Sequence, residues 1–307
     1  MTEVRAMSEV EQIVDFLSTC SLEVTPGGAA KVDDFRSLLR EGQTVYVTFL
    51  PGSDFADTLT TVQKLKAQGM RPVPHLAARS IPSKAFLEEN LKRLRDECAI
   101  EEALLIGGGV DTPVGEFTET MQVLRTGLFE KYGFRKLGVA GHPEGSPDIP
   151  AAECDRAIRE KNVFAKDSGL QLYIATQFCF EAAPIVAWDR RLREELGNEL
   201  PIHIGIPGLA TIKTLLKHAQ QCGIGNSMRV LTRQAANITK LMTVREPDTL
   251  VRDLAMERSR NPEFGVRQCH LYPLGGLKKS AAWLYGVQDG KIELKRKGGF
   301  ETQFSVD

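Results

Sequence analysis

One pattern repeats eight times along this chain: a short apolar run ends in a turn and is followed by a segment with helical spacing. Strand followed by helix in eightfold repetition is typical of an α/β protein with the parallel (β/α)8 architecture of a TIM barrel. In such a barrel the loops after the strands meet at one mouth and carry the chemistry. We therefore expect the functional residues at the C-terminal ends of the strands. The eight runs begin at Ser21, Thr44, Arg71, Ala103, Lys136, Leu170, Ile202 and Val266.

Cap and turn residues set the boundaries of the predicted elements. The predicted strands span residues 21–26, 44–49, 72–76, 103–106, 136–141, 170–177, 202–206 and 266–272. The predicted helices span residues 10–17, ahead of the barrel, and 33–42, 57–69, 83–97, 111–132, 148–169, 184–196 and 211–221. Ser80 and Pro82 are interpreted as the N-cap and first-turn proline of the helix at 83–97.

Two additions to the plain barrel are predicted near the C-terminal end. Residues 227–242 and 248–258 have helical spacing and form an insertion before the eighth strand. Asp289-Gly290 within a Val- and Ile-containing stretch predicts a closing β-hairpin over residues 284–294. With no low-complexity linker, all 307 residues are expected to form a single catalytic domain.

Composition restricts the classes of partner. Lysine plus arginine (39) nearly cancels aspartate plus glutamate (40), and the net charge of -1 argues against nucleic-acid or anionic-membrane binding. The six cysteines contain no C-x-x-C pair, which excludes zinc-ribbon spacing and fits reduced thiols. The N-terminus has no basic-then-apolar signal, and no apolar run reaches the length of a membrane span. We expect a soluble cytoplasmic protein with a small-molecule partner.

Ordered motifs at the predicted strand ends resemble those of methylenetetrahydrofolate reductases. Any one of these motifs is weak, but each falls where a barrel places its site, and together they cover nearly the whole chain. The series is Ser21-x-Glu23-x-x-Pro26, Val47-Thr48-Phe49, Pro74-His75-Leu76, Gly138 to Pro147 with His142 and Glu144, Thr176-Gln177-Phe178, Pro207-Gly208 and His270-x-Tyr272-x-Leu274. The resemblance implies a barrel that holds FAD at the strand ends and passes hydride between the flavin and the one-carbon unit of a tetrahydrofolate.

The resemblance implies that Glu23 is the catalytic residue. Hydride transfer involving a folate methylene requires the imidazolidine ring to open or close, and a proton then moves on nitrogen. Glu23 would be the general acid in reduction and the base in the reverse direction; on position alone, a helix-capping carboxylate is the commoner outcome. Gln177 can donate and accept hydrogen bonds and is expected to hold the amide edge of the pterin, against a structural role paired with backbone.

A flavin needs donors for its pyrophosphate and polar or planar walls around its ring. The resemblance assigns this to Thr48, Phe49, His75 and His142, although a lone histidine in an apolar strand is more often structural. The family usually has tyrosine at the position of His142 and histidine at that of Ser146. The aromatic wall of the flavin site and one of its phosphate contacts are therefore made by different side chains in this chain.

The helix after the fifth strand supplies the expected pyrophosphate contacts. Asn162 and Lys166 lie four residues apart on one helical face, which suits a shared phosphate. The loop before Gln177 is one residue longer than the family pattern, which makes Lys161 an equal candidate. A solvated helix face is the structural alternative for these three residues.

The fourth strand departs most from the family. Where the family carries Arg-Gly-Asp, this chain has Ile106-Gly107-Gly108-Gly109, so the family's acidic residue has become Gly108. The backbone N–H groups of the three glycines can bind flavin edge atoms or a phosphate, or the glycines simply form a tight turn. Asp111 is the expected substitute for the missing acid. The family's basic residue for the folate tail is replaced by Gly275-Gly276, which leaves Lys278 or Lys279 to bind it.

The expected function is therefore that of an FAD-dependent oxidoreductase that interconverts 5,10-methylene- and 5-methyltetrahydrofolate. The chain ends without the regulatory domain of the animal enzymes and resembles the short bacterial type. Physiological oxidation of methyltetrahydrofolate and a flavin- or folate-binding barrel without turnover remain as alternatives, although the presence of Glu23 speaks against the second. A non-flavin barrel lyase or aldolase should show a lysine at a strand end for Schiff-base chemistry, and the sequence has none there. NADH and NADPH are both open as electron partners, a homo-oligomer is expected, and no metal site is predicted.

Overall fold

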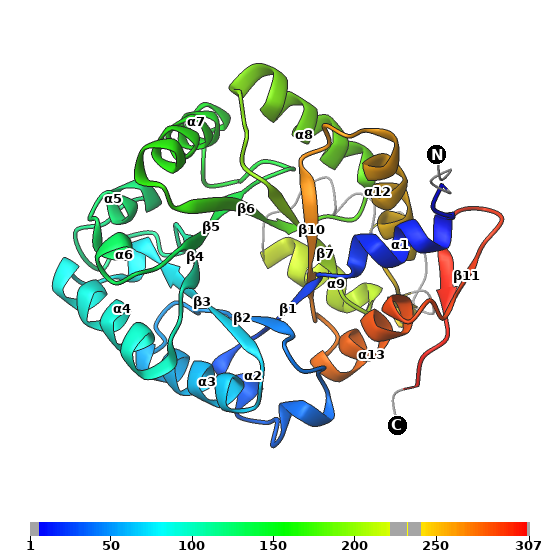
Figure 1. The fold of residues 1–307 in the computed structure, drawn as a ribbon, viewed down its shortest axis with the longest axis horizontal. Coiled ribbons are helices and arrows are strands. Elements are labelled where there is room, and N and C mark those ends of the chain that lie inside the picture. The colour runs from blue at the N-terminus through cyan, green and yellow to red at the C-terminus, as the bar shows by residue number, and fades with distance from the viewer. Residues whose placement is uncertain (1–5, 222–231, 233–240, 306–307) are drawn as a thin grey trace, which may run out of the picture.

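The computed structural model describes residues 6–221, 232 and 241–305. Eight parallel strands close into a barrel in the order β1-β10-β7-β6-β5-β4-β3-β2, and the helices surround it (Figure 1). All eight predicted strands are present, within two residues at each end. Their bounds are β1 Ser21–Val24, β2 Thr44–Val47, β3 Arg71–Ala77, β4 Glu102–Ile106, β5 Lys136–Gly141, β6 Gln171–Phe178, β7 Ile202–Pro207 and β10 Val266–Tyr272. The predicted TIM-barrel fold is confirmed.

The longer helices follow the predicted order around the barrel. The helices are α1 Glu9–Leu17, α2 Pro26–Ala29, α3 Phe55–Ala67, α4 Lys84–Cys98, α5 Thr120–Leu124, α6 Leu128–Lys131, α7 Ala151–Ser168, α8 Ala182–Leu196, α9 Ile212–Gln221, α12 Asp248–Arg260 and α13 Leu277–Gln288, with short 3-10 turns η1 Phe35–Ser37 and η2 Ala78–Ser80. Helix α1 precedes the barrel and packs on α12 and α13 (Figure 1). A short antiparallel pair, β8 Ala210–Thr211 with β9 Val244–Arg245, flanks α9. Most of the predicted helix at 227–242 lies outside the described residues.

Two helix predictions were wrong because tertiary contacts hold the backbone. Within residues 33–42 only η1 forms, and the amide N–H of its buried Phe35 donates to the side chain of Gln68 at 2.7 Å. Residues 111–119 form a loop before α5, and the Arg79 guanidinium binds backbone oxygens at both ends of it. These bonds tie the loop backbone to Arg79 and so compete with the local hydrogen bonds of a helix.

The cap and hairpin predictions were displaced. Ser83, and not Ser80, caps α4, since the Ser83 hydroxyl accepts from the amide N–H of Phe86 at 3.1 Å. The C-terminal hairpin exists, but it joins β11 Ile292–Leu294 to β12 Phe300–Thr302. Residues 284–288 continue α13 because Leu284 and Val287 are buried, and Asp289-Gly290 ends that helix.

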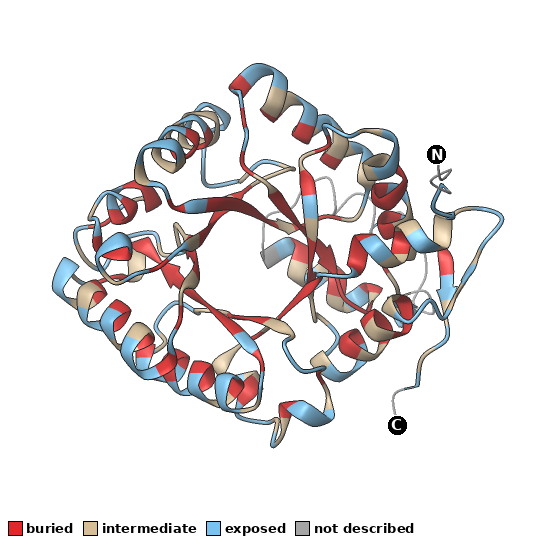
Figure 2. Cartoon of the chain, viewed as in Figure 1, coloured by how far each residue is buried: buried red, intermediate tan, exposed pale blue. Residues whose placement is uncertain are grey.

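The main hydrophobic core lies between the strands and the surrounding helices, and buried residues follow the strands and the helix faces turned toward them (Figure 2). The barrel interior is different: it holds a small cluster around Tyr46 and Tyr173, whose hydroxyl groups lie 2.7 Å apart. The His203 ring stacks on Tyr173 with a centroid distance of 3.9 Å. A TIM barrel is usually filled by branched aliphatic side chains. The polar groups of Tyr46, Tyr173 and His203 inside this barrel are therefore unusual for the fold.

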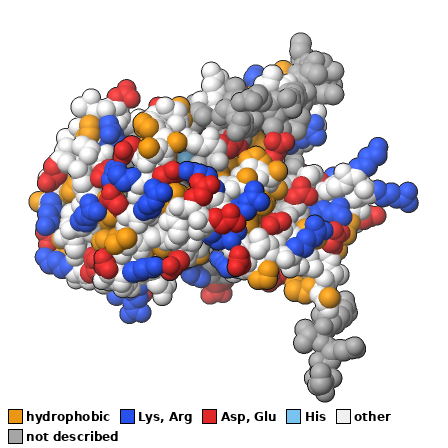
Figure 3. Space-filling view, turned by 90° about the horizontal axis from the view of Figure 1, so that it is seen from above, with side chains coloured by type: hydrophobic (Ala, Val, Ile, Leu, Met, Phe, Trp, Pro, Cys, Tyr) orange, Lys and Arg blue, Asp and Glu red, His pale blue; other side chains and the backbone are white. Residues whose placement is uncertain are grey.

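The surface carries interspersed charge. Basic and acidic side chains alternate over the face in Figure 3, in keeping with the near-zero net charge. Within the described part of the chain, no helix is both long and apolar enough to cross a membrane. The five described cysteines are unpaired, and all except Cys154 are buried; Cys222 lies outside the described residues.

Candidate active site

Glu23 and His270 form a pair at the barrel mouth. Successive side chains of a strand point to opposite faces, so Ser21 and Glu23 of β1 share the face that looks into the barrel. The closing register pairs Ser21 with His270 of β10. Nδ1 of His270 lies 2.9 Å from the Ser21 hydroxyl, and Nε2 lies 3.4 Å from Oε2 of Glu23. The imidazole therefore connects the hydroxyl to the carboxylate.

The surroundings of Glu23 favour its ionised form. Its side chain is only 16% exposed, and this burial alone would raise the pKa of the carboxyl. The hydrogen bond and charge of His270, with smaller contributions from His75 and Thr48, outweigh burial and lower the pKa below its usual value. Glu23 is thus a partly exposed carboxylate at neutral pH, and His270 can exchange a proton with it.

His75 stands beside this pair with unsatisfied polar atoms. Neither ring nitrogen of His75 has a hydrogen-bond partner within the described structure, although the residue is only 6% exposed. Burial, partly opposed by Glu23, lowers the pKa of His75 to about 4, so its imidazole is neutral and offers one donor and one acceptor. Buried polar groups are normally bonded, and an orphaned pair is expected to meet a ligand or water.

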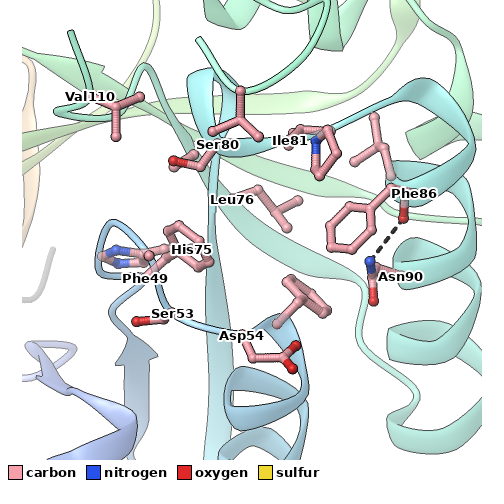
Figure 4. A pocket seen from close by; sticks show the side chains of 16 residues that line it. Phe49, Ser53, Asp54, His75, Leu76, Ser80, Ile81, Phe86, Asn90 and Val110 are labelled. Carbon is pink, nitrogen blue, oxygen red and sulfur yellow. Dashed lines mark hydrogen bonds between the residues drawn. The ribbon is translucent and has the colours of Figure 1, made fainter. Parts of the chain in front are cut away.

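An apolar cavity of about 310 Å³ opens next to His75, between the N-terminal ends of α3 and α4 (Figure 4). His75 and Phe49 lie on one side of it and Phe86 and Asn90 on the other (Figure 4). Ser80, at the end of η2, also lines the cavity, and its buried hydroxyl has no partner within the described structure. The cavity therefore has aromatic walls and a polar edge.

Arg79 fixes the glycine loop over this region. Its guanidinium donates to the carbonyls of Val110 and Asp111, and its backbone N–H donates to the carbonyl of Gly107. Gly108 has a φ of +94°, and an added Cβ would lie 3.2 Å from the Cβ of Ala77. An aspartate, which the resembling family carries at this position, would be strained here. Asp111 is exposed on the same loop.

The loop after β5 brings His142 and Lys161 together. Lys161 of α7 is buried, and its amine donates to the carbonyl of Ala140 near the end of β5 at 3.2 Å. Burial lowers the pKa of Lys161 to about 8. The pKa of His142 is also lowered, mainly by burial and to a smaller extent by the nearby charge of Lys161. Ser146 lies in this loop, where its hydroxyl accepts from the amide N–H of Asp148.

Asn162 and Lys166 do not belong to the mouth, which corrects their predicted role. The Asn162 amide donates to Asn198 and accepts from the backbone N–H of Glu199, in the loop that leads into β7. Lys166, one turn further along α7, forms an ion pair with Glu199. Both are therefore held at the opposite end of the barrel from the strand C-termini. Of the three candidates on this helix, Lys161 alone reaches the mouth.

Gln177 and Lys278 lie at the mouth on the remaining side. Gln177 is partly buried at the end of β6, and its side-chain oxygen accepts from the backbone N–H of Phe178 at 3.2 Å, so part of its polar group serves the backbone. Lys278 is exposed in the first turn of α13, just after β10. The structure thus brings together Glu23, Thr48, His75, the glycine loop, His142, Lys161 and Gln177 around one opening.

These residues fit a flavin in part. The orphaned nitrogens of His75, the partly exposed backbone of Gly107 to Gly109 and the aromatic ring of Phe49 suit a ring system with polar edges. The buried amine of Lys161, which donates to the carbonyl of Ala140, suits one phosphate. The second phosphate contact expected on α7 is not present.

No model of a protein family matches this chain. Among solved structures, it is similar to an uncharacterized protein from Clostridium thermocellum that binds two copies of 5-methyl-5,6,7,8-tetrahydrofolic acid, with 12% identity over 86% of this chain and 96% of that one and a TM-score of 0.46. A chitinase from Rhizomucor miehei is similar at 12% identity over 89% of this chain and 99% of that one, with a TM-score of 0.49. At such low identity and TM-scores, neither likeness bears on what this chain binds.

Sequence reasoning missed the roles of His270 and Arg79. His270 was a member of a motif, but its contact with Glu23 was not predicted. The signal was available, because closure of the barrel makes the first and eighth strands neighbours and puts Ser21 opposite His270. Arg79 carried no such signal, since its partners are backbone oxygens of a loop that was expected to be helical.

Proposed function

We propose that this barrel is a flavin-dependent oxidoreductase that interconverts methylene- and methyltetrahydrofolate. The observation that carries the proposal is the Ser21–His270–Glu23 arrangement, which puts a proton-exchanging carboxylate at the mouth of a barrel whose other strand ends resemble a folate oxidoreductase. FAD, when bound, would supply the hydride acceptor or donor. Lys161, His142, the glycine loop and His75 are the residues that would hold it.

The lowered pKa of Glu23 favours one direction. In the oxidation of methyltetrahydrofolate, hydride leaves the methyl carbon, N10 bonds to the resulting iminium carbon, and the proton on N10 must depart. A carboxylate that is ionised at neutral pH accepts that proton, and His270 can pass it on. Reduction would first require Glu23 to be protonated. We therefore propose that oxidation of methyltetrahydrofolate is the direction to which the site is better suited.

Gln177 would orient the folate. The amide N–H of Phe178 occupies one lone pair of its side-chain oxygen, which leaves the NH2 group to donate to a pterin carbonyl. Lys278, exposed in the first turn of α13, would meet the anionic tail of the folate. NADH or NADPH would exchange electrons with the flavin at the same mouth.

The absorption spectrum tests the flavin directly. The protein should purify with a flavin spectrum or acquire one when FAD is added and excess cofactor is removed. A colourless protein with no affinity for FAD would overturn the assignment as a flavoenzyme.

A further inference from the structure

The apolar cavity beside the mouth has features that the proposed reaction does not use. It lies between α3 and α4, Glu23 is not among the described residues that line it, and its walls include the rings of Phe49, Phe55 and Phe86. Phe55 and Phe86 meet edge to face at a centroid distance of 6.3 Å, which is an ordinary arrangement in aromatic clusters. A volume of about 310 Å³ is at the low end of the range for ligand sites and holds one or two rings.

Polar atoms at one side of this cavity lack partners. Both nitrogens of His75 and the hydroxyl of Ser80 are buried and unbonded within the described structure, and both residues line the cavity. A buried polar atom that is left unpaired has lost its hydrogen bonds to water without replacement, which is unfavourable. A ligand with its own donor and acceptor would remove that cost, whereas a pure hydrocarbon would not.

The charges exclude an anionic ligand. Among the described residues that line the cavity, none is a lysine or arginine, the His75 imidazole is neutral, and Asp54 is the only acidic residue. The Asp54 carboxylate accepts from the amide N–H of Ala56 and so caps α3. A phosphate or carboxylate at this rim would meet a like charge and no cation.

The wall is held in place before any ligand arrives. The backbone N–H of Val114 donates to the carbonyl of Arg79, and the Arg79 guanidinium binds the carbonyl of Val110, so the loop that carries both valines is fastened to the end of β3. Both valines line the cavity. A preformed cavity of this kind avoids the entropic cost of ordering a loop on binding.

From these observations we propose that the cavity between α3 and α4 is a separate binding site for an uncharged one- or two-ring aromatic heterocycle, which stacks among the phenylalanines and bonds to His75 and Ser80. The proposed flavin cradle shares His75 and Phe49 with this cavity, and the His75 ring has one nitrogen for each ligand. The inference does not rest on the proposed reaction.

Three probes of one shape separate the physical contributions. Benzimidazole has a donor and an acceptor, indene has the same ring shape without nitrogen, and 5-carboxybenzimidazole adds a negative charge. Binding to the full chain is measured by calorimetry and ligand-observed NMR at pH 8, with and without FAD. Benzimidazole should bind with a Kd of roughly 0.1–1 mM, indene about fivefold or more weakly, and the carboxylate more weakly than benzimidazole.

Variants locate the site. Ser80→Ala should weaken benzimidazole by about fivefold and leave indene unchanged, whereas the exposed Ser18→Ala should alter neither. Leu87→Phe adds volume to a lining residue and should weaken both probes. If Leu87→Phe does not fold, the comparison of the two probes on Ser80→Ala decides alone.

Several results would overturn the proposal: no binding of benzimidazole, equal binding of benzimidazole and indene, tighter binding of the carboxylate, or no effect of Ser80→Ala. Displacement of FAD by benzimidazole would show that the cavity belongs to the flavin site. A protein that binds benzimidazole as predicted but never binds FAD would refute the proposed function and leave this inference standing.

Discussion

Nε2 of His270 lies 3.4 Å from Oε2 of Glu23, and the opposite ring nitrogen lies 2.9 Å from the hydroxyl of Ser21. The three residues meet because the first and last barrel strands pair in a register that puts Ser21 opposite His270. A carboxylate joined to an imidazole can exchange a proton without either group moving far. The site chemistry therefore depends on where the barrel closes.

Replacing Glu23 by glutamine removes the titratable proton and keeps the size of the side chain. General acid-base catalysis contributes about two to four powers of ten, so Glu23→Gln should lose roughly that much folate-dependent turnover. FAD content, and any flavin reduction by a nicotinamide, should remain near the parent values, because neither involves the folate proton. Full folate turnover in the variant would show that another group carries the proton.

His270→Gln tests the pairing itself. The hydrogen bond and charge of His270 lower the pKa of Glu23, so their removal should raise that pKa. The acid limb of the pH–rate profile for methyltetrahydrofolate oxidation should move to higher pH, with FAD content unchanged. A variant whose rate falls equally at all pH values would indicate a purely structural histidine.

Two lysines on α7 make a matched pair for the flavin phosphate. Lys161 is buried at the mouth, whereas Lys166 forms an ion pair with Glu199 at the other end of the barrel. Lys161→Met should weaken FAD binding about tenfold or more, and Lys166→Met should leave it unchanged. Equilibrium dialysis with FAD provides the comparison. Equal effects of the two substitutions would remove Lys161 from the cradle.

The histidines inside the barrel should make stability depend on pH. Burial, with the charges of Lys136 and His270, lowers the pKa of His203 to about 3, so the unfolded chain binds the extra proton first. Stability should therefore fall as the pH drops below about 6.5, and the contribution of His203 amounts to about 2 kcal/mol between pH 7 and pH 5. His203→Phe keeps a ring against Tyr173 and should lose about that part of the difference. Denaturant unfolding at both pH values measures it; an unchanged difference would contradict a buried neutral His203.

The strands were predictable from the sequence because each is a short apolar run with a turn at its end. Parallel strands are buried on both faces, so their signal survives without knowledge of the neighbours. The misjudged segments are those whose backbone is bound by distant side chains. Gln68 holds the amide of Phe35, and Arg79 holds the carbonyls of the loop after β4. Local propensity cannot report such contacts.

The candidate site was predictable at the strand ends and not on the helices. A residue that ends a barrel strand lies at the mouth, and Glu23, Thr48 and His75 lie in or directly after β1, β2 and β3. On α7, whether a side chain reaches the mouth depends on the direction in which it leaves the helix and on its position along the helix axis. The neighbours Lys161 and Asn162 differ in this way, since Lys161 contacts the carbonyl of Ala140 and Asn162 contacts Asn198. The sequence spacing was compatible with both, and only the packing of α7 on β5 distinguishes them.

Anaerobic mixing of the FAD-loaded protein with methyltetrahydrofolate is the most direct test of the proposed function. The account predicts that the absorbance of oxidised flavin is lost in a single phase, that Glu23→Gln slows this loss, and that methylenetetrahydrofolate restores the absorbance of the reduced protein. The proposed function would be contradicted if saturating methyltetrahydrofolate left the absorbance of oxidised flavin unchanged and methylenetetrahydrofolate also failed to reoxidise the reduced flavin.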